Sequence, residues 1–373
     1  MPLVTYWEYL KLESLLVLQS GLDEDETKIL PDELHFIIVH QVFELWFKLI
    51  LKELRIVRDC LSERKSDEQK IPAVLHRINR INKILSTAVQ HWDVMETMPP
   101  QDFLDFRDKL FPASGFQSFQ FPEIEILMGL EEAMLTVNGQ VRSLDHIKKM
   151  ASECPAGAWA WNHIEGVRKE QTLRSVLHDW LYSTDIQGST PNDVGDTKFV
   201  QEFLAKYLMA IRDYHQQQIR QLLMAPDSNR SALEKKFANS GRIAEDFLFA
   251  QDVTEDQRAK YQRLRAALLY IESNQQCSKM AWPHVLIDAL LDMEELVVLW
   301  RTRHARMAER VIGRRIGTGG SSVSYLDETL SHRVFTELWA ARTQVLPRHL
   351  VPPEASVEEA SLRLKDSRGL NSS

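Results

Sequence analysis

The chain has 373 residues, of which 44% are hydrophobic and 26% are charged, and its formal net charge is −8 at pH 7. This composition is typical of a globular protein that buries a large core in one or two domains. The acidic balance argues against nucleic acid as a partner, because binding phosphate requires a basic surface. The sequence has no apolar run of about 18 residues and no signal-peptide pattern at its N-terminus, so we expect no membrane segment.

Helical periodicity dominates the sequence from residue 32 onward, with apolar residues at every third or fourth position. No alternating pattern typical of a strand is found. The predicted fold class is therefore all-α, with helices packed around one core. We expect helices over residues 32–61, 73–97, 100–111, 121–150, 197–223, 256–275 and 283–312.

Two polar segments, residues 185–196 and 225–231, interrupt the helical pattern. The stretch at about 150–255 is charged and weakly patterned, and we interpret it as a helical excursion from a single domain that spans residues 1–352. Residues 353–373 are polar, which predicts a disordered C-terminal tail.

Three cysteines, Cys60, Cys154 and Cys277, lie far apart in the sequence. Their spacing is not that of a metal site. Free thiols in a reducing compartment are the simplest interpretation, which favours a cytoplasmic protein.

A glycine-rich segment follows the last long helical pattern and reads "GTGGSSVSYL", residues 317–326. Such loops often hold phosphate, but this one has no P-loop lysine and follows a helix rather than a strand. Two alternatives remain: a flexible connector, or a loop whose amides and hydroxyls close over a small polar ligand.

Two neighbouring histidines, His35 and His40, lie in the first long helix, and His40 shares one face with Phe36, Phe43 and Phe47. A histidine on an apolar face is usually a core residue with its hydrogen bonds satisfied. In a dry pocket, however, it could accept a hydrogen bond from a substrate N–H or move a proton. His35 is rotated off this face and is the weaker candidate.

His304 lies on another helix, in the segment "LWRTRHARMAERVIG". A neutral imidazole on a rigid helix is suited to bind haem iron as an axial ligand, with Trp300 one turn earlier beside it. A structural histidine fits the same pattern. The sequence has no HExxH motif and no spacing of two histidines and one carboxylate, so zinc and non-haem iron sites are not expected.

Arg107, Leu110 and Ser114 are offset by three and four residues, so they face one direction if their helix persists to Pro112. An arginine beside apolar residues can bind a carboxylate through two hydrogen bonds. A surface ion pair with Asp105 or Asp108 is an equally good interpretation of the spacing.

Several long segments of the chain together resemble the tryptophan 2,3-dioxygenase family. They occur in the same order across nearly the whole chain, and the similarity is weakest at about residues 150–255. The segments read "DELHFIIVHQVFELWFKLILKEL", "DFRDKLFPASGFQSFQF", "LWRTRHARMAERVIGRRIGTGGSS" and "LPRHLVP".

The resemblance implies an all-α cytoplasmic enzyme, usually a homotetramer, with one haem b per subunit. It would insert dioxygen across the indole C2=C3 bond of L-tryptophan to give N-formyl-L-kynurenine. Two alternatives stay open. A family variant could transfer one oxygen, or use peroxide, on a substituted tryptophan in a natural-product pathway. A non-catalytic protein could bind haem or an indole as a sensor.

The resemblance also implies residue roles, with His304 as the axial iron ligand and His40 as the catalytic residue near the substrate indole N–H. Arg107 would bind the amino acid carboxylate, and Thr318 would contact the substrate as the glycine-rich loop closes. Tyr6 and Tyr9 match tyrosines that the family donates across a subunit interface. The cofactor-binding set is His304, Ser114 and Trp300, and the substrate-binding set is Phe36, His40, Phe103, Arg107, Leu110, Thr318, Tyr6 and Tyr9.

The chain departs from the family pattern at three places. Val323 stands where the loop has a glycine, and the loop is one residue shorter. Pro122 and Asp327 each stand where the family has an arginine. A β-branched residue resists a positive φ, so we expect this loop to close differently.

Overall fold

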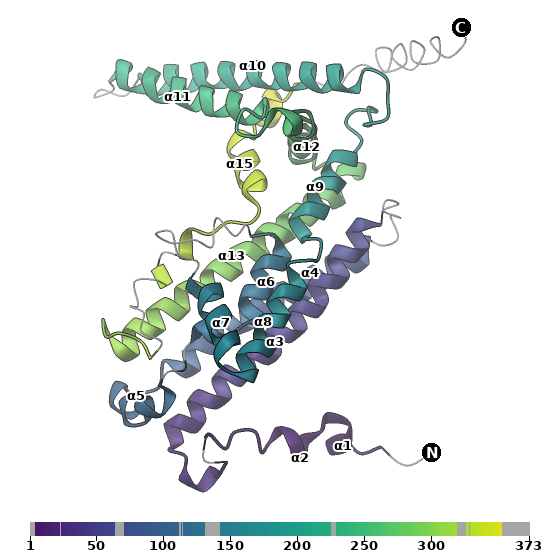
Figure 1. The fold of residues 1–373 in the computed structure, drawn as a ribbon. Coiled ribbons are helices and arrows are strands. Elements are labelled where there is room, and N and C mark those ends of the chain that lie inside the picture. Colours follow the sequence, from purple (N-terminus) through teal and green to yellow (C-terminus); the bar gives the residue numbers. More distant parts are fainter. Residues whose placement is uncertain are drawn as a thin grey trace. The chain divides into compact units, whose positions relative to one another are not determined.

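The computed structural model describes residues 4–22, 24–63, 71–111, 113, 115–130, 142–224, 229–318, 326–327 and 329–352. These residues form helices and connecting loops, and they contain no strand beyond a single bridge between Ile186 and Ser189. The predicted all-α fold is confirmed (Figure 1). The α-helices are α1 (Tyr6–Leu10), α2 (Leu12–Leu15), α3 (Pro31–Ser62), α4 (Ile71–Met95), α5 (Pro100–Arg107), α6 (Gln120–Met128), α7 (Arg142–Glu153), α8 (Pro155–Val167), α9 (Leu173–Ser183), α10 (Asp196–Leu222), α11 (Arg230–Leu248), α12 (Glu255–Ser273), α13 (Ser278–Ile312) and α15 (Thr336–Gln344).

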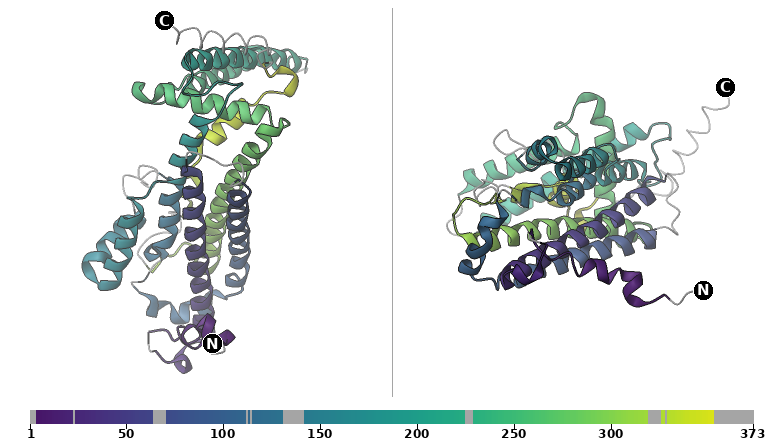
Figure 2. Two further views of the ribbon diagram at one scale, coloured as in Figure 1. Left: turned by 90° about the vertical axis from the view of Figure 1, so that its right-hand side faces the viewer. Right: turned by 60° about the horizontal axis from the view of Figure 1, so that its bottom comes forward.

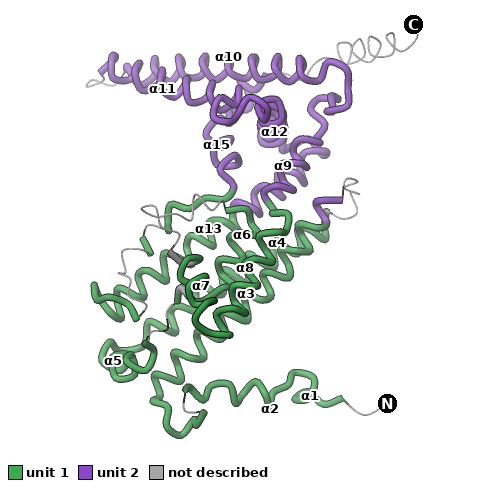
Figure 3. Tube along the Cα trace, in the orientation of Figure 1, with its two compact units in different colours: residues 1–59, 72–173, 292–334 green, residues 60–71, 174–291, 335–373 purple. Residues whose placement is uncertain are grey.

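The chain divides into two compact units, drawn in green and purple in Figure 3. The first unit comprises residues 1–59, 72–173 and 292–334, and the second comprises residues 60–71, 174–291 and 335–373. The single domain over 1–352 stays a prediction, and residues 353–373 lie outside the described part of the chain.

The first unit is built on α3, α4 and the part of α13 from Asp292 onward. Figures 1 and 2 show α3 and α4 running side by side. Aromatic rings join the three helices, since the Phe43 ring on α3 lies 4.5 Å from Trp92 on α4 and 5.6 Å from Trp300 on α13. Helix α8 packs against both α6 and α7.

The sequence explains both the start and the buried face of α3. Pro31 opens the helix, and Asp32 and Glu33 place negative charge in its first turn, where the exposed N–H groups favour it. By length and composition alone, α3 is apolar enough to cross a membrane. The same properties are typical of a core helix, and α3 buries one face of apolar residues, which are Val39, Phe43, Phe47, Ile50, Leu51, Leu54 and Val57.

Two predicted helices end earlier than their patterns suggested. Helix α5 ends at Arg107 and gives way to a 3₁₀ turn over Asp108–Leu110, after which Phe111 is extended. The expected helical alignment of Arg107, Leu110 and Ser114 is therefore wrong. The helix predicted over 121–150 is also divided, because Gly129 adopts a φ of 114° and ends α6.

In the second unit, α10 packs against α11 and α12, and α12 also packs against α15. A buried arginine, Arg263, joins the polar loop at 185–196 to this unit. Its guanidinium donates to Asp196 Oδ1 over 2.5 Å and to the carbonyl oxygens of Tyr182 and Thr184 over 2.8 Å. This helical region includes most of the stretch that the sequence marked as weakly patterned.

Candidate active site

A cavity of about 310 Å³ lies within the first unit, between α3, α4, α5, α6 and α13. This volume is in the range of small-molecule binding sites, about 300–1,000 Å³. Most of its wall is apolar or aromatic. The sequence-predicted residues that line it are Phe36, His40, Phe103, Arg107, Leu110, Trp300, His304 and Thr318.

His304 is presented to the cavity by α13. It makes no hydrogen bond to any residue that the structure describes, and its ring stacks on Trp92 at 4.9 Å with an interplanar angle of 4°. Burial lowers the pKa of His304 to about 4, and His40 acts in the same direction. The imidazole is therefore neutral at pH 7 and can offer a nitrogen lone pair.

The indole rings of Trp92 and Trp300 line the cavity beside His304. The Trp300 ring lies 5.5 Å from the His304 ring and 5.4 Å from the Trp92 ring. Both indole N–H groups are buried and lack a hydrogen-bond partner among the described residues.

His40 projects into the same cavity from α3. Its Nδ1 lies 2.8 Å from the Phe36 carbonyl oxygen, four residues earlier, so Nδ1 carries the proton and Nε2 is an acceptor. Burial lowers the pKa of His40, and the hydrogen bond to Phe36 opposes that shift only in part. His40 is thus a neutral acceptor with a fixed tautomer, whereas His35 does not line the cavity.

Arg107 lies at the last turn of α5 and lines the cavity with Leu110. One of its terminal N–H groups donates to the Ile316 carbonyl oxygen, and its Nε is buried with no partner among the described residues. It forms no ion pair with Asp105 or Asp108 in the described part of the chain, so the surface-pair interpretation has no support. The guanidinium retains donors for an anion.

Three phenylalanines pack together beside these polar groups. The Phe36 ring lies 6.0 Å from Phe103 and 5.7 Å from Phe106, and the last two rings are 5.3 Å apart. Such edge and tilted arrangements are favourable for aromatic pairs. Phe36 also lies 4.0 Å from the His40 ring, so the apolar wall continues to the acceptor nitrogen.

The other predicted residues are not all at the cavity. Thr318 and Gly317 line it, but residues 319–325, including Val323, lie outside the described residues, as does Ser114. Tyr6 is 69% exposed and Tyr9 is 78% exposed, and neither lines the cavity.

Several lining residues were missed by the sequence analysis, among them Trp92, Phe121, Glu125 and Arg301. Arg301 pairs with Glu125 inside the cavity wall, and its guanidinium lies 5.6 Å from the Phe121 ring. The spacing of residues in one helix indicates its faces, but it does not indicate which faces meet. A tryptophan on the apolar face of α4 was the one available signal.

The two positions where the resemblance leads us to expect an arginine differ in environment. Pro122 is buried and lines the cavity, next to Phe121, whose ring stacks on Trp300 at 4.5 Å. Asp327 instead pairs with Arg306 on α13. Pro122 therefore brings no charge to the wall, and Asp327 forms an ion pair with α13.

Comparison with known proteins identifies the family. The family model described as tryptophan 2,3-dioxygenase matches residues 2–345. A tryptophan 2,3-dioxygenase from Sorangium cellulosum is 39% identical over 98% of this chain and 89% of its own length. The tryptophan 2,3-dioxygenase 2 of Ralstonia nicotianae is 41% identical over 94% of this chain and 95% of its own length. The chain therefore belongs to the tryptophan 2,3-dioxygenase family of oxidoreductases.

Proposed function

We propose that the protein is a haem-dependent cytoplasmic enzyme that adds both atoms of dioxygen across the indole C2=C3 bond of L-tryptophan, giving N-formyl-L-kynurenine. The observation that carries the proposal is one apolar cavity with two half-buried imidazoles in its wall and Arg107 at its edge. The family membership supports the same reaction.

The residues around His304 fit a haem b. His304 is neutral, has no hydrogen bond to the described residues, and faces a cavity whose wall includes the apolar side chains of Met307, Val311 and Ile312. His304 would hold the haem iron, and Trp300 and Ser114 would be the other residues that contact the haem. When bound, haem supplies an iron with an open coordination position for dioxygen.

His40 would orient the substrate by accepting a hydrogen bond from the indole N–H, and it would not need to act as a base. Its Nε2 is an acceptor because Nδ1 is held by the Phe36 carbonyl. An indole N–H is a donor only, so the two groups are complementary. This hydrogen bond would fix which edge of the indole faces the reactive oxygen, and fixed geometry contributes to the rate.

Arg107 would bind the carboxylate while Phe36, Phe103 and Leu110 enclose the indole. Removing one indole from water contributes roughly 2–3 kcal/mol at the usual area coefficient. The charge-assisted pair adds orientation as well as affinity. Together these contacts select an aromatic amino acid over a free indole and exclude water from the reacting atoms.

Thr318 and the N-terminal tyrosines would complete the site. Thr318 already lines the cavity, at the start of the glycine-rich loop that would close over the amino acid. The exposed Tyr6 and Tyr9 would reach the substrate of a neighbouring subunit in a homotetramer. Their exposure in a single chain supports that role, because large apolar side chains are usually covered in the assembled protein.

Isotope labelling tests the reaction. We expect the ferrous protein, titrated with L-tryptophan without oxygen and then given ¹⁸O₂, to form a product with two labelled atoms. A product with one labelled atom, or turnover only with peroxide and a substituted tryptophan, would instead indicate the family variant. A haem spectrum without any oxygen-dependent turnover would indicate a sensor.

A further inference from the structure

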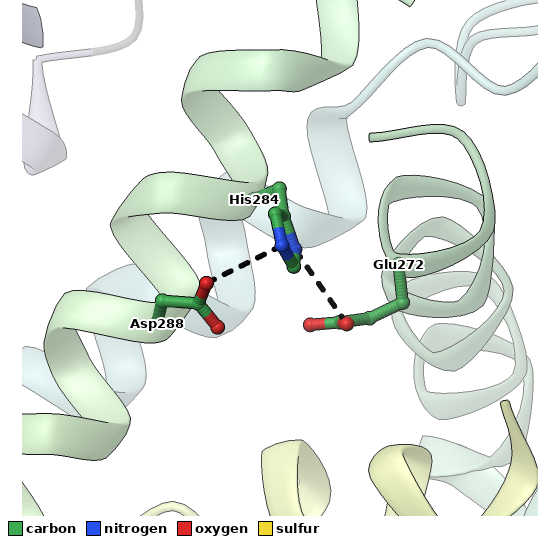
Figure 4. Close-up of side chains that lie close together, drawn as sticks. All are labelled: Glu272, His284 and Asp288. Atoms are coloured by element: carbon green, nitrogen blue, oxygen red, sulfur yellow. Dashed lines mark ion pairs between the residues drawn. The ribbon is translucent and has the colours of Figure 1, made fainter. Parts of the chain in front are cut away.

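A second cluster of ligand-type side chains lies in the second unit, separate from the cavity described above. Glu272 is at the end of α12, and His284 and Asp288 are in the first turns of α13 (Figure 4). Figure 4 shows both carboxylates pointing toward the imidazole ring between them. The dioxygenase reaction proposed above makes no use of these three residues.

The donor atoms are close enough to share one ion. Asp288 Oδ2 lies 3.3 Å from His284 Nε2, and Glu272 Oε2 lies 3.6 Å from His284 Nδ1. One ligand atom from each residue can be chosen so that all three lie within 4.8 Å of one another. His284 and Asp288 are four residues apart on one helix, so they face the same direction without backbone strain.

Two buried ligand-type atoms at this cluster have no hydrogen bond to any residue in the described part of the chain. Glu272 is 5% exposed, and its Oε1 makes no hydrogen bond, although Arg342 Nε forms an ion pair with it at 3.5 Å. His284 Nδ1 is also buried without a hydrogen bond. A buried carboxylate oxygen without a hydrogen bond is costly, and coordination to a cation removes that cost.

Arg342 of α15 is the cation that faces the cluster. It pairs with Asp288 Oδ1 and approaches Glu272, so a metal ion would compete with it for the same two carboxylates. The Arg342 side chain is 39% exposed and can turn to solvent. The exposed part of Asp288, 43% of its side chain, leaves a route by which an ion can enter.

We propose that Glu272, His284 and Asp288 bind a divalent first-row metal ion of the zinc type. One imidazole and two carboxylates suit zinc, whereas calcium and magnesium prefer all-oxygen sites. Water would complete the coordination shell. The bound ion would connect the end of α12 to the start of α13 and displace Arg342 from the carboxylates. Residue spacing could not predict this site, because Glu272 comes from a different helix than His284 and Asp288.

The experiment is equilibrium dialysis of the purified full-length chain, as isolated, against zinc ion, with bound metal counted by mass spectrometry. We expect about one zinc per chain at this site. The isosteric variants Asp288→Asn and Glu272→Gln should each weaken binding at least about tenfold, since even indirect contacts to a metal ligand contribute that much. His349→Ala, which removes an exposed histidine of the same unit, is the matched control and should bind like the parent chain.

Replacing Arg342, which competes for the carboxylates, should change zinc affinity in the opposite direction. Arg342→Met should tighten zinc binding, because the carboxylates are then free of their cation. Zinc should also raise the unfolding temperature of the parent chain, and a chelator should reverse that rise. The proposal is overturned if no stoichiometric zinc binds, if Asp288→Asn and Glu272→Gln bind as tightly as the parent, or if Arg342→Met does not tighten binding.

Discussion

Replacing Arg107 with alanine should separate recognition of the amino acid from recognition of the indole. The guanidinium keeps one N–H on the Ile316 carbonyl, and because Arg107 lines the cavity, its other N–H groups remain for a carboxylate. A hydrogen bond to a charged group contributes about 1.5–3 kcal/mol. At about 1.4 kcal/mol for each factor of ten, Arg107→Ala should weaken L-tryptophan binding about 10- to 150-fold.

The assay is anaerobic titration of the ferrous protein with L-tryptophan and, separately, with plain indole, followed by absorbance. Indole lacks the carboxylate, so its affinity should change little. Arg310→Ala is a suitable control, since Arg310 is exposed on α13 and does not line the cavity. Equal losses for tryptophan and indole would refute the carboxylate contact and indicate a general disturbance of the pocket.

Three further predictions follow from the cavity wall. His40→Leu should weaken L-tryptophan binding about tenfold, the contribution of one hydrogen bond. The variant should hardly affect the binding of 1-methyltryptophan, which has no indole N–H. Equal losses of affinity for both ligands would contradict the role of His40 as an acceptor. Burial lowers the pKa of His40 below its ordinary 6.5, so the imidazole stays neutral as the pH falls through that value. The affinity for L-tryptophan should therefore stay constant down to about pH 6.5 and fall only at lower pH. A loss of affinity with its midpoint at pH 6.5 would count against this. Trp92 is only 1% exposed, so Trp92→Ala should lower the free energy of unfolding by about 3–5 kcal/mol, measured by urea denaturation. Trp159 lies on the surface, so Trp159→Ala should lower it much less.

Helical periodicity predicted the part of the site that lies on one helix. Phe36, His40, Phe43 and Phe47 were expected on one face of α3, and all four line the cavity. The buried face of a long helix is set by its 3.6-residue repeat, so this information is local in the sequence. The same reasoning placed His304 on a rigid helix with Trp300 beside it, but it did not find Trp92, on which the His304 ring stacks.

The remainder of the site depends on contacts between helices. The stacking of Trp92 on His304 joins positions 212 residues apart in the sequence (304 minus 92), and no spacing rule links them. Helix ends were also missed: Gly129 stops α6 inside an apolar run, and the turn after Arg107 is 3₁₀ rather than α. Arg107 and Leu110 still meet at the cavity, although for a different geometric reason from the expected helical offset.

The central claim is that His304 holds the iron of a haem, and haem content measures it most directly. We predict that the parent chain, purified from haem-supplemented cells, carries one haem per chain by the pyridine haemochrome assay. His304→Ala should lose stoichiometric haem while keeping its helical circular dichroism spectrum. A folded His304→Ala variant that retains one haem per chain, with an unchanged axial-ligand spectrum, would contradict the account.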